Sequence, residues 1–333
     1  MMRVLKLLSA LLLLSPLPPG FSHVMNQFSD VPHCDGFFLD GITPDFPGIL
    51  VNGIIQHQNR YKPICQFFNN TYRFATLYDT TNRIPVFSAY TFTGTGGRGR
   101  PRNQRWMIEP QLNVGDSKSM KTDPGKDLYE LQAGNMDYNN SITINGVNRG
   151  HLFPSSHAPD EDTKRSTFTL TNIVPQAVTF NGGSWNKMEN KVRDILQNQC
   201  IDNNDMIKAH VVTGAVPSVN NKLNKRVNIP SHMWTAYCCY NNNLKRWMSE
   251  AHWGENKQNS STTNHTLAEL YSWLGKQHNG VVKVFSDLCP TGVSTIPATT
   301  NPNTASTLLP PKAQNLFFFH TIIMVTMSTI QLV

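Results

Sequence analysis

Apolar and polar positions alternate most regularly in residues 71–94, TYRFATLYDTTNRIPVFSAYTFTG. Aromatic and β-branched residues fill most of the apolar positions, and a polar run from Asp79 to Asn82 divides the segment. Two alternating runs separated by a short polar turn are typical of a β-hairpin. Residues 28–67 show no such period and contain several prolines, so we expect a loop-rich lead-in before the hairpin.

A strand–strand–helix succession is predicted between residues 141 and 197. The first strand covers residues 141–154 and ends near His151, and the second covers residues 168–174, where Pro175 is expected to stop it. Residues 184–197 carry apolar side chains at helical spacing. Asn181, Trp185 and Glu189 step by four along this helix entry, which places them on the side facing the His151 strand.

The connection between these strands, residues 155–166, is predicted to be a loop followed by a helix start. Its acidic cluster, Asp160, Glu161 and Asp162, suits a helix N-terminus better than a metal site, because carboxylates interact favourably with the helix dipole there. His157 in the same loop is expected at the surface. A short helix is also predicted at residues 126–132, within the polar stretch 112–140.

The second half of the chain has the pattern of a scaffold. Residues 208–216 and 227–240 are predicted strands, residues 266–277 an amphipathic helix, and residues 280–289 a short closing strand. Three histidines of this half are expected to be structural or on the surface: His210, His232 and His252.

Both ends of the chain differ in composition from residues 28–289, which we predict to form the folded domain. In residues 1–22, Arg3 and Lys6 precede an apolar run and then small residues, which is typical of a secretory signal peptide cleaved near Ser22. Residues 290–314 are rich in Pro, Ser, Thr and Asn and are predicted to be a disordered linker. The apolar tail, residues 315–333, fits a GPI signal, an anchoring helix or a terminus without function, so membrane attachment is one alternative.

Secretion makes disulfides the expected state of the 6 cysteines, Cys34, Cys65, Cys200, Cys238, Cys239 and Cys289. No Cys-x-x-Cys pair is present, which argues against a zinc site. Proximity favours Cys34 with Cys65 and the later four among themselves. Because neighbouring residues of a strand point to opposite faces, Cys238 and Cys239 are expected to have different partners.

Glycosylation sequons agree with secretion and predict a glycoprotein. They begin at Asn69, Asn139, Asn259 and Asn264. The formal net charge of +7 fits a phosphate-rich partner, although this mild basic excess decides little by itself. A length of 333 residues allows one large domain or two small ones.

The polar side chains of residues 147–189 suit the hydrolysis of a phosphodiester. An imidazole such as His151 can take a proton from water. A guanidinium such as Arg149 can hold a phosphate by two parallel hydrogen bonds. A side-chain amide oxygen, as in Asn181, can hold Mg²⁺ together with waters. A histidine at a strand end is more often structural, so the combination of these groups carries the prediction.

The segments NRGHLFPSSH and TNIVPQAVTFNGGSWNKME resemble the signature of the DNA/RNA non-specific endonucleases, which have a ββα-metal (His-Me finger) core. Further stretches, including FSDVPHCDGFF and VNIPSHMWTAYCC, are similar to the vertebrate endonuclease domain-containing 1 proteins. The resemblance covers residues 28–289. It implies an α+β fold, with the ββα core inside a mixed, mainly antiparallel sheet and helix domain.

The resemblance implies that His151 is the general base and that Asn181 holds one Mg²⁺ or Mn²⁺ ion. Arg149 would stabilise the charge of the transition state. Glu189 and Asn172 would position metal-bound water and the loop of the histidine. DNA and RNA would be the substrates, cut without strong sequence preference.

The family also has an arginine just ahead of the tryptophan that corresponds to Trp106. Here a Gly- and Arg-rich loop precedes Trp106, and it is either a solvated basic loop or a phosphate-binding rim. Arg105 or Arg102 is the expected counterpart of the family arginine.

One position departs from the family pattern, because Asn148 stands where the motif usually begins with Asp. If that carboxylate only anchors backbone, Asn can replace it at a cost of about 1–2 kcal/mol. If it acts through its charge, activity falls by orders of magnitude. Two functions therefore stay open: a secreted or membrane-tethered Mg²⁺-dependent nuclease, and a weakened nuclease-fold glycoprotein that binds nucleic acid or a protein partner.

Overall fold

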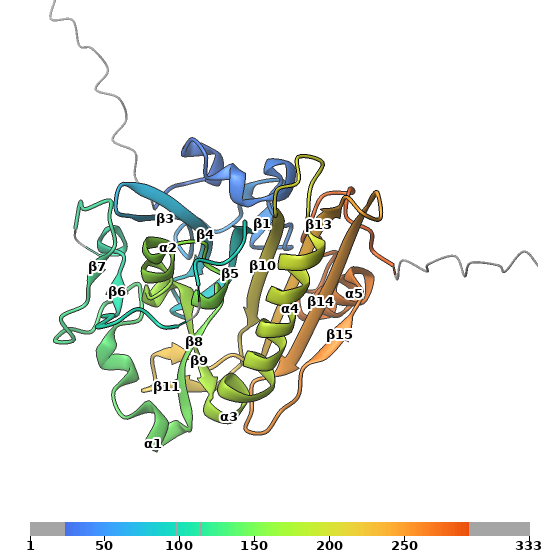
Figure 1. Cartoon of the computed structure of the whole chain (residues 1–333). Coiled ribbons are helices and arrows are strands. Elements are labelled where there is room, and N and C mark those ends of the chain that lie inside the picture. Colours follow the sequence, from blue (N-terminus) through green and yellow to red (C-terminus); the bar gives the residue numbers. More distant parts are fainter. Residues whose placement is uncertain (1–23, 98, 114, 293–333) are drawn as a thin grey trace, which may run out of the picture. The chain divides into compact units, whose positions relative to one another are not determined.

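A seven-stranded antiparallel sheet forms the centre of the computed structural model, which describes residues 24–97, 99–113 and 115–292 (Figure 1). The strand order is β15-β14-β13-β10-β5-β4-β3. The predicted hairpin is confirmed, since β4 and β5 are adjacent and antiparallel. In chain order the strands are β3 (Tyr61–Phe68), β4 (Thr71–Asp79), β5 (Ile84–Phe92), β10 (Ala209–Val216), β13 (His232–Asn241), β14 (Arg246–Glu255) and β15 (Thr263–His265).

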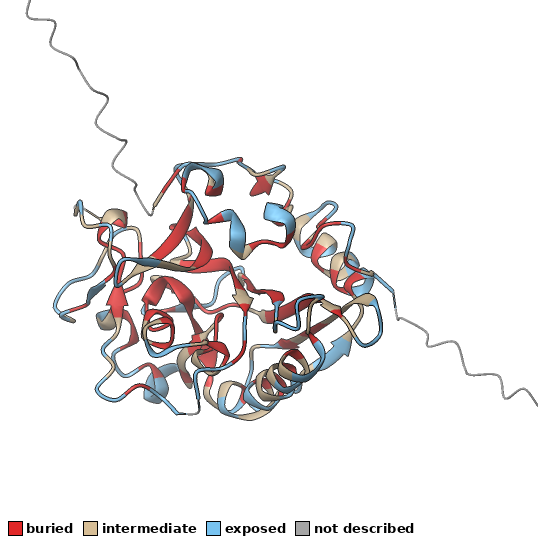
Figure 2. Cartoon of the chain, turned by 45° about the horizontal axis from the view of Figure 1, so that its top comes forward, coloured by how far each residue is buried: buried red, intermediate tan, exposed pale blue. Residues whose placement is uncertain are grey.

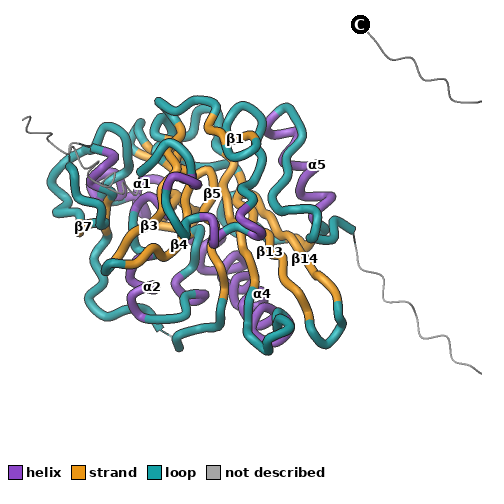
Figure 3. The backbone as a smooth tube through the Cα atoms, turned by 90° about the horizontal axis from the view of Figure 1, so that it is seen from above, coloured by secondary structure: helices purple, strands orange, loops and turns teal. Residues whose placement is uncertain are grey.

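Each face of this sheet buries its own apolar core, because successive side chains of a strand point to opposite faces. On β5, Phe87 and Ala89 join one core, and Tyr90 and Phe92 join the other. The helix α5 (Leu267–His278) packs on the first face, and α4 (Asn186–Gln199) packs on the second. Seen from above, the strands lie between these two helices (Figure 3). Buried residues fill the interior of the domain, while the outer sides of its helices are exposed (Figure 2).

The strand–strand–helix succession is confirmed on the second face. The strand β8 (Val147–His151) pairs with β9 (Ile173–Ala177) in an antiparallel ribbon. The chain then continues through α3 (Val178–Phe180) and a π-helical turn, η8 (Asn181–Trp185), into α4. The α+β class predicted from the sequence is therefore correct.

The bounds of this unit differ from the prediction. Residues 141–145 form a helix, α1 (Ser141–Asn145), and only the residues after it extend into β8. The second strand begins at Ile173, after a 3-10 turn at Leu170–Asn172, and Pro175 lies inside it opposite Arg149. A proline fits there because a two-stranded ribbon leaves half of its backbone N–H groups without a strand partner.

Three further predictions were wrong. Residues 61–68, most of which belong to the expected loop-rich lead-in, form the edge strand β3, whose position at the sheet edge tolerates Pro63. No helix forms at residues 126–132, where side chains form hydrogen bonds with the backbone instead. The Gln132 amide accepts from Glu109 N at 2.9 Å and donates to Glu109 O at 2.7 Å. Residues 280–289 make one bridge, Asp45 with Lys283, rather than a strand.

Small elements complete the described part of the chain. The short strands are β1 (Leu50–Val51), β2 (Ile54–Ile55), β6 (Met107–Ile108), β7 (Lys121–Thr122), β11 (Lys222–Leu223) and β12 (Val227–Asn228). The short helices are η1 (Phe28–Asp30), η2 (Asp35–Phe37), η3 (Leu39–Gly41), η4 (Pro110–Leu112), η5 (Asn135–Tyr138), η6 (Ser155–His157) and α2 (Glu161–Ser166).

Three disulfides fasten these elements to the sheet. Cys34 pairs with Cys65 of β3, Cys200 at the end of α4 pairs with Cys239 of β13, and Cys238 pairs with Cys289. The neighbouring cysteines of β13 therefore have different partners, on opposite faces of the sheet, as the sequence indicated.

The predicted signal peptide, most of the linker and the apolar tail lie outside the described residues. Within residues 24–292, gaps at 98 and 114 aside, no helix has the length and apolarity needed to cross a membrane.

Candidate active site

A cavity of about 750 Å³ opens beside the ββα unit. It brings together Asn148, Arg149 and His151 of β8 with Asn181 of the π-helical turn. The remaining wall comes from the basic loop, from the segments around Trp106 and Phe168, and from the polar face of α4: Asn190, Arg193, Asp194 and Gln197. Three of the predicted site residues, His151, Arg149 and Asn181, thus meet in one cavity.

His151 stands at the end of β8, one residue after a glycine that the packing requires. A Cβ atom on Gly150 would lie only 2.0 Å from Oε1 of the buried Gln176, so no larger residue fits without moving that side chain. The glycine of the Arg-Gly-His sequence is therefore a packing requirement of this site.

The imidazole of His151 is held between aromatic rings and kept neutral. Its ring centre lies 4.8 Å from Phe168 and 5.6 Å from Trp106. Nε2 is buried and has no hydrogen-bond partner among the described residues. Burial, with a smaller contribution from the nearby Arg100 guanidinium, lowers the pKa of His151 to about 3. The ring is therefore an unprotonated base at neutral pH.

Arg149 is clamped so that its guanidinium faces the cavity. The group lies 5.1 Å from the ring centre of Trp106 and 4.8 Å from that of Tyr138. Nη2 donates to Asn135 Oδ1 at 3.0 Å, while Nε is buried without a partner among the described residues. Burial lowers the pKa of this arginine, but a guanidinium stays charged at any physiological pH.

Asn181 is oriented by Asn148. Its Nδ2 donates to Asn148 Oδ1 at 2.7 Å and lies 3.5 Å from the carbonyl oxygen of Arg149. The amide oxygen of Asn181 makes no hydrogen bond with the described residues, and the residue lines the cavity. The π-helical turn that carries it is a rare conformation, found frequently at functional sites.

This donor set fits a hydrated hard cation and no tightly enclosed metal. Among the described residues no group of three or more His, Cys, Asp or Glu side chains could hold an ion. An amide oxygen with water ligands suits Mg²⁺, which usually keeps several waters and relies on substrate phosphate for further oxygens. Asn181 is the residue that would hold such an ion.

Asn172 lies outside the cavity and shapes the turn that follows His151. It is fully buried, and its amide accepts from Phe153 N (3.0 Å) and donates to Phe153 O (3.1 Å). The same side chain accepts from Ser88 of β5 (2.9 Å) and donates to Thr167 O (3.0 Å). It ties the chain after the histidine to the central sheet.

Glu189 also does not line the cavity. Its half-buried side chain lines a separate small cavity with Tyr90 and Trp185. Burial raises the pKa of Glu189 to about 8, with the Trp185 indole acting in the opposite direction. In the metal-free protein this carboxyl is therefore largely protonated at neutral pH.

His157 is buried, so its expected surface position is wrong. Nε2 contacts the carbonyl oxygen of Glu189 at 2.9 Å, and Nδ1 contacts the Tyr90 hydroxyl at 2.8 Å. Because a carbonyl only accepts, Nε2 carries the proton and the Tyr90 hydroxyl donates to Nδ1. This neutral ring, whose pKa burial lowers to about 4, connects the turn after His151 with α4 and β5. No local pattern in the sequence could show these partners.

The basic loop contributes Arg100 to the cavity, rather than Arg102 or Arg105. The Arg100 guanidinium lies 4.9 Å from the ring centre of Phe168 and 5.8 Å from that of Trp106. The loop is anchored at Gly96, whose N–H donates to Ala158 O (2.9 Å) and whose carbonyl accepts from Lys164 Nζ (3.1 Å). Counting back from Trp106 along the sequence did not single out Arg100.

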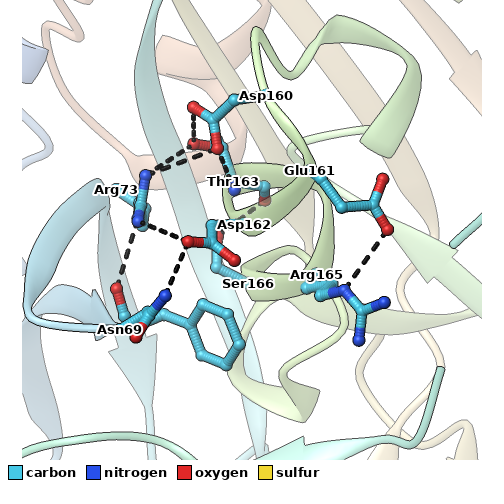
Figure 4. A network of polar contacts seen from close by, with 9 residues as sticks. Asn69, Arg73, Asp160, Glu161, Asp162, Thr163, Arg165 and Ser166 are labelled. Atoms are coloured by element: carbon cyan, nitrogen blue, oxygen red, sulfur yellow. Dashed lines mark hydrogen bonds and ion pairs between the residues drawn. The ribbon is translucent and has the colours of Figure 1, made fainter. Parts of the chain in front are cut away.

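The acidic cluster after His157 is structural, as predicted (Figure 4). Asp160 caps α2 by accepting from Thr163 N at 2.8 Å. Arg73 of β4 pairs with Asp160 and Asp162 at 3.5 and 3.4 Å, and Asn69 donates to Asp162 at 2.7 Å. These contacts fasten α2 to the β3–β4 turn.

Comparison with known proteins matches residues 53–279 to the DNA/RNA non-specific endonuclease family. The chain is similar to human endonuclease domain-containing 1 protein, with 32% identity over 213 residues, which covers 62% of this chain and 38% of that protein. It is similar to the mouse protein of the same description, with 33% identity over 224 residues, covering 65% and 40%. A third relative, the zebrafish mitochondrial nuclease EXOG, is 28% identical over 163 residues, covering 47% and 43%.

Proposed function

Because the chain belongs to the DNA/RNA non-specific endonuclease family, we propose that it hydrolyses phosphodiester bonds of DNA and RNA with the help of a divalent cation, Mg²⁺ or Mn²⁺. The chain spans only about two fifths of the length of the human and mouse relatives, at 38% and 40%. The meeting of His151, Arg149 and Asn181 in one cavity is the observation that supports the proposal most strongly.

His151 acts as the general base. Its neutral ring takes a proton from a water, whose oxygen attacks phosphorus as the bond to the 3′-oxygen breaks. The products are a 5′-phosphate and a 3′-hydroxyl, which takes up a proton from solvent. A phosphodiester anion in the cavity raises the pKa of the imidazole and makes it a better proton acceptor than in the free protein.

Arg149 and Arg100 hold the phosphate and stabilise the charge that develops on it. Arg149 is fixed before substrate arrives by Asn135 and two aromatic rings, so little reorganisation is needed at the moment of reaction. Asn181 would hold a divalent cation, which would supply Lewis-acid stabilisation of the charge on the phosphate. Asn148 fixes the Asn181 amide by accepting from its nitrogen and so leaves the amide oxygen for the cation.

The cavity supports cutting without sequence preference. Its charged groups, three arginines and one aspartate, suit contacts to phosphate rather than to base edges. Sugar identity matters little to such contacts, which is why both DNA and RNA are proposed substrates.

We also propose that the protein is a secreted glycoprotein. Three disulfides among the described residues support an oxidising compartment. The four sequon asparagines are exposed, as glycan attachment requires. Attachment to a membrane through the C-terminal tail belongs to the same proposal.

A second candidate function is favoured by Asn148, which leaves the site without the family's carboxylate. It is a glycoprotein that keeps the basic cavity and binds nucleic acid, or a protein partner, without cutting. Against it, Asn148 Oδ1 accepts the hydrogen bond that orients Asn181, so this position fixes the amide without a carboxylate.

Digestion of plasmid DNA and of RNA by protein secreted from a eukaryotic host separates the two functions. Wild type is expected to cut both with Mg²⁺ and neither with EDTA. His151→Ala is expected to be inactive, while His57→Ala, a matched change of an exposed histidine, is expected to cut like wild type. A silent wild type beside an active Asn148→Asp variant would identify a disabled nuclease and leave binding as the function.

A further inference from the structure

We infer that the divalent cation and the phosphodiester enter this cavity as a coupled pair, each binding weakly without the other, and that Asn148 sets this coupling. The inference rests on the proposed function and concerns the same cavity. It follows from the balance of charges in the wall, from the ligand that the wall offers a cation, and from the bond between two neutral amides.

The cavity wall repels a bare cation. Arg100, Arg149 and Arg193 line it, and among the described lining residues Asp194 has the only carboxylate. That carboxylate is already engaged, because it lies 3.0 Å from Nη2 of Arg193. A dication entering alone meets an excess of positive charge in a partly desolvated space, where such repulsion is stronger than in water.

The wall also offers a cation little to bind. Asn181 supplies one neutral amide oxygen, while its amide nitrogen is committed to Asn148 Oδ1 at 2.7 Å. Mg²⁺ sheds water reluctantly and is usually held by one or two carboxylates in addition to phosphate oxygens. The one carboxylate among the described lining residues, Asp194, is already paired through Oδ1 with Arg193, so the cation depends mainly on oxygens that the substrate brings.

A phosphodiester supplies both missing elements. Its negative charge offsets the arginines, and its non-bridging oxygens become ligands for the cation. The cation in turn neutralises part of the negative charge of the phosphodiester, which the arginines would otherwise have to balance alone. Coupling of binding free energies is reciprocal, so each ligand must tighten the other by the same factor.

Asn148 determines how strong the coupling is. It holds the Asn181 amide as a carboxylate would, but it adds no negative charge beside the cation position. A carboxylate in its place would keep the hydrogen bond and attract the cation before substrate arrives. Asn148→Asp should therefore tighten cation binding to the free protein and reduce the dependence on phosphodiester.

Mn²⁺ binding, followed by the loss of its free EPR signal, tests the inference with the dinucleotide TpT as the phosphodiester. His151→Ala prevents cleavage and leaves the cavity charge unchanged, because His151 is neutral. Saturating TpT is expected to tighten Mn²⁺ binding about tenfold or more, and calorimetry is expected to show Mn²⁺ tightening TpT by the same factor. Asn181→Ala should abolish the coupling, while Asn203→Ala, an exposed asparagine outside the cavity, should leave it intact.

Equal Mn²⁺ affinity with and without TpT, or unchanged Mn²⁺ affinity of the free Asn148→Asp protein, would overturn the inference. If the uncoupled protein still binds TpT and wild type still digests DNA, the proposed function stands and only the inference fails. If TpT does not bind at any Mn²⁺ concentration and wild type digests nothing, the proposed function fails with it.

Discussion

The amide nitrogen of Asn181 donates a 2.7 Å hydrogen bond to Oδ1 of Asn148, across the gap between the π-helical turn and β8. This bond engages the amide nitrogen of Asn181 and leaves its oxygen free to bind, and Asn181 lines the same cavity as His151 and Arg149. The position at which the chain departs from its family is thus in direct contact with the residue expected to hold the cation.

Asn148→Ala removes this contact and frees the Asn181 side chain to rotate. We expect the rate of DNA cleavage at fixed Mg²⁺ to fall about 10–100-fold, the usual cost of losing a group that orients a metal ligand. Asn148→Asp keeps an acceptor at the same place and should cut at least as fast as wild type. Cleavage rates over a Mg²⁺ series check both variants, and an Asn148→Ala enzyme with a wild-type rate would show that the contact does not matter.

Arg149→Lys tests whether the clamped guanidinium is needed. A lysine keeps the charge but loses the planar contacts with Trp106 and Tyr138 and the two-point hold on phosphate. We expect kcat to fall about tenfold or more with a smaller change in KM. Thermal unfolding of the same protein serves as the control for folding, and an unchanged kcat would mean that charge alone suffices.

The loop arginine can be identified by three matched variants. Arg100→Gln should lower the cleavage rate about tenfold, because Arg100 lines the cavity and contacts the Phe168 ring. Arg102→Gln and Arg105→Gln remove the same charge from the same loop but away from the cavity, so we expect changes of less than about threefold at moderate salt. A larger loss in Arg105→Gln than in Arg100→Gln would restore the assignment made from the sequence.

Glu189 should make stability fall as pH rises. Its pKa in the folded protein is about 8, above the usual 4.5, so between pH 4.5 and 8 the folded form binds a proton that the unfolded form has released. The free energy of unfolding therefore decreases with pH in this window, by up to about 1.4 kcal/mol per pH unit. Glu189→Gln cannot titrate and should lose this slope, so in EDTA its Tm at pH 8 should exceed that of wild type by several degrees.

Comparing the Tm of wild type and Glu189→Gln at each pH cancels the contribution of the histidines to the pH dependence, because they titrate equally in both proteins. Below pH 6.5 His157 contributes the opposite trend. Its pKa is lowered to about 4, so the unfolded form takes up a proton first and stability falls as pH drops from 6.5 to 4. A Glu189→Gln protein with the same Tm difference from wild type at pH 5 and pH 8 would show that this carboxyl is not buried as described.

The core of the site could be predicted because its residues are close in sequence and follow secondary-structure periods. Arg149 and His151 share β8, and Asn181 lies at the entry to α4, so their types and spacing indicate their chemistry. The resemblance to a known family then supplied their roles. Sequence spacing could not show which residues of this segment line the cavity and which do not. Glu189, for example, lines a separate small cavity.

The features that the sequence did not predict depend on contacts between segments far apart in the chain. His157 can be buried because both of its ring nitrogens form hydrogen bonds with distant segments. The Tyr90 hydroxyl, 67 residues earlier, donates to Nδ1, and the carbonyl of Glu189 accepts from Nε2. Arg100 lines the cavity in a loop that Lys164 and Ala158 bind at Gly96. The strand β3 lies within the expected loop-rich lead-in, and its Pro63 is tolerated because of the position of β3 at the edge of the sheet.

The most direct test of the account is chemical rescue of a His151→Gly enzyme. Removing the ring leaves a space at the position of the base, bounded by Phe168 and Trp106. We predict that this variant cuts plasmid DNA at least about 100-fold more slowly than wild type with Mg²⁺, and that added imidazole restores part of the rate without affecting wild type. A His151→Gly enzyme that cuts as fast as wild type, or one that binds DNA but gains nothing from imidazole, would contradict the assignment of His151 as the general base.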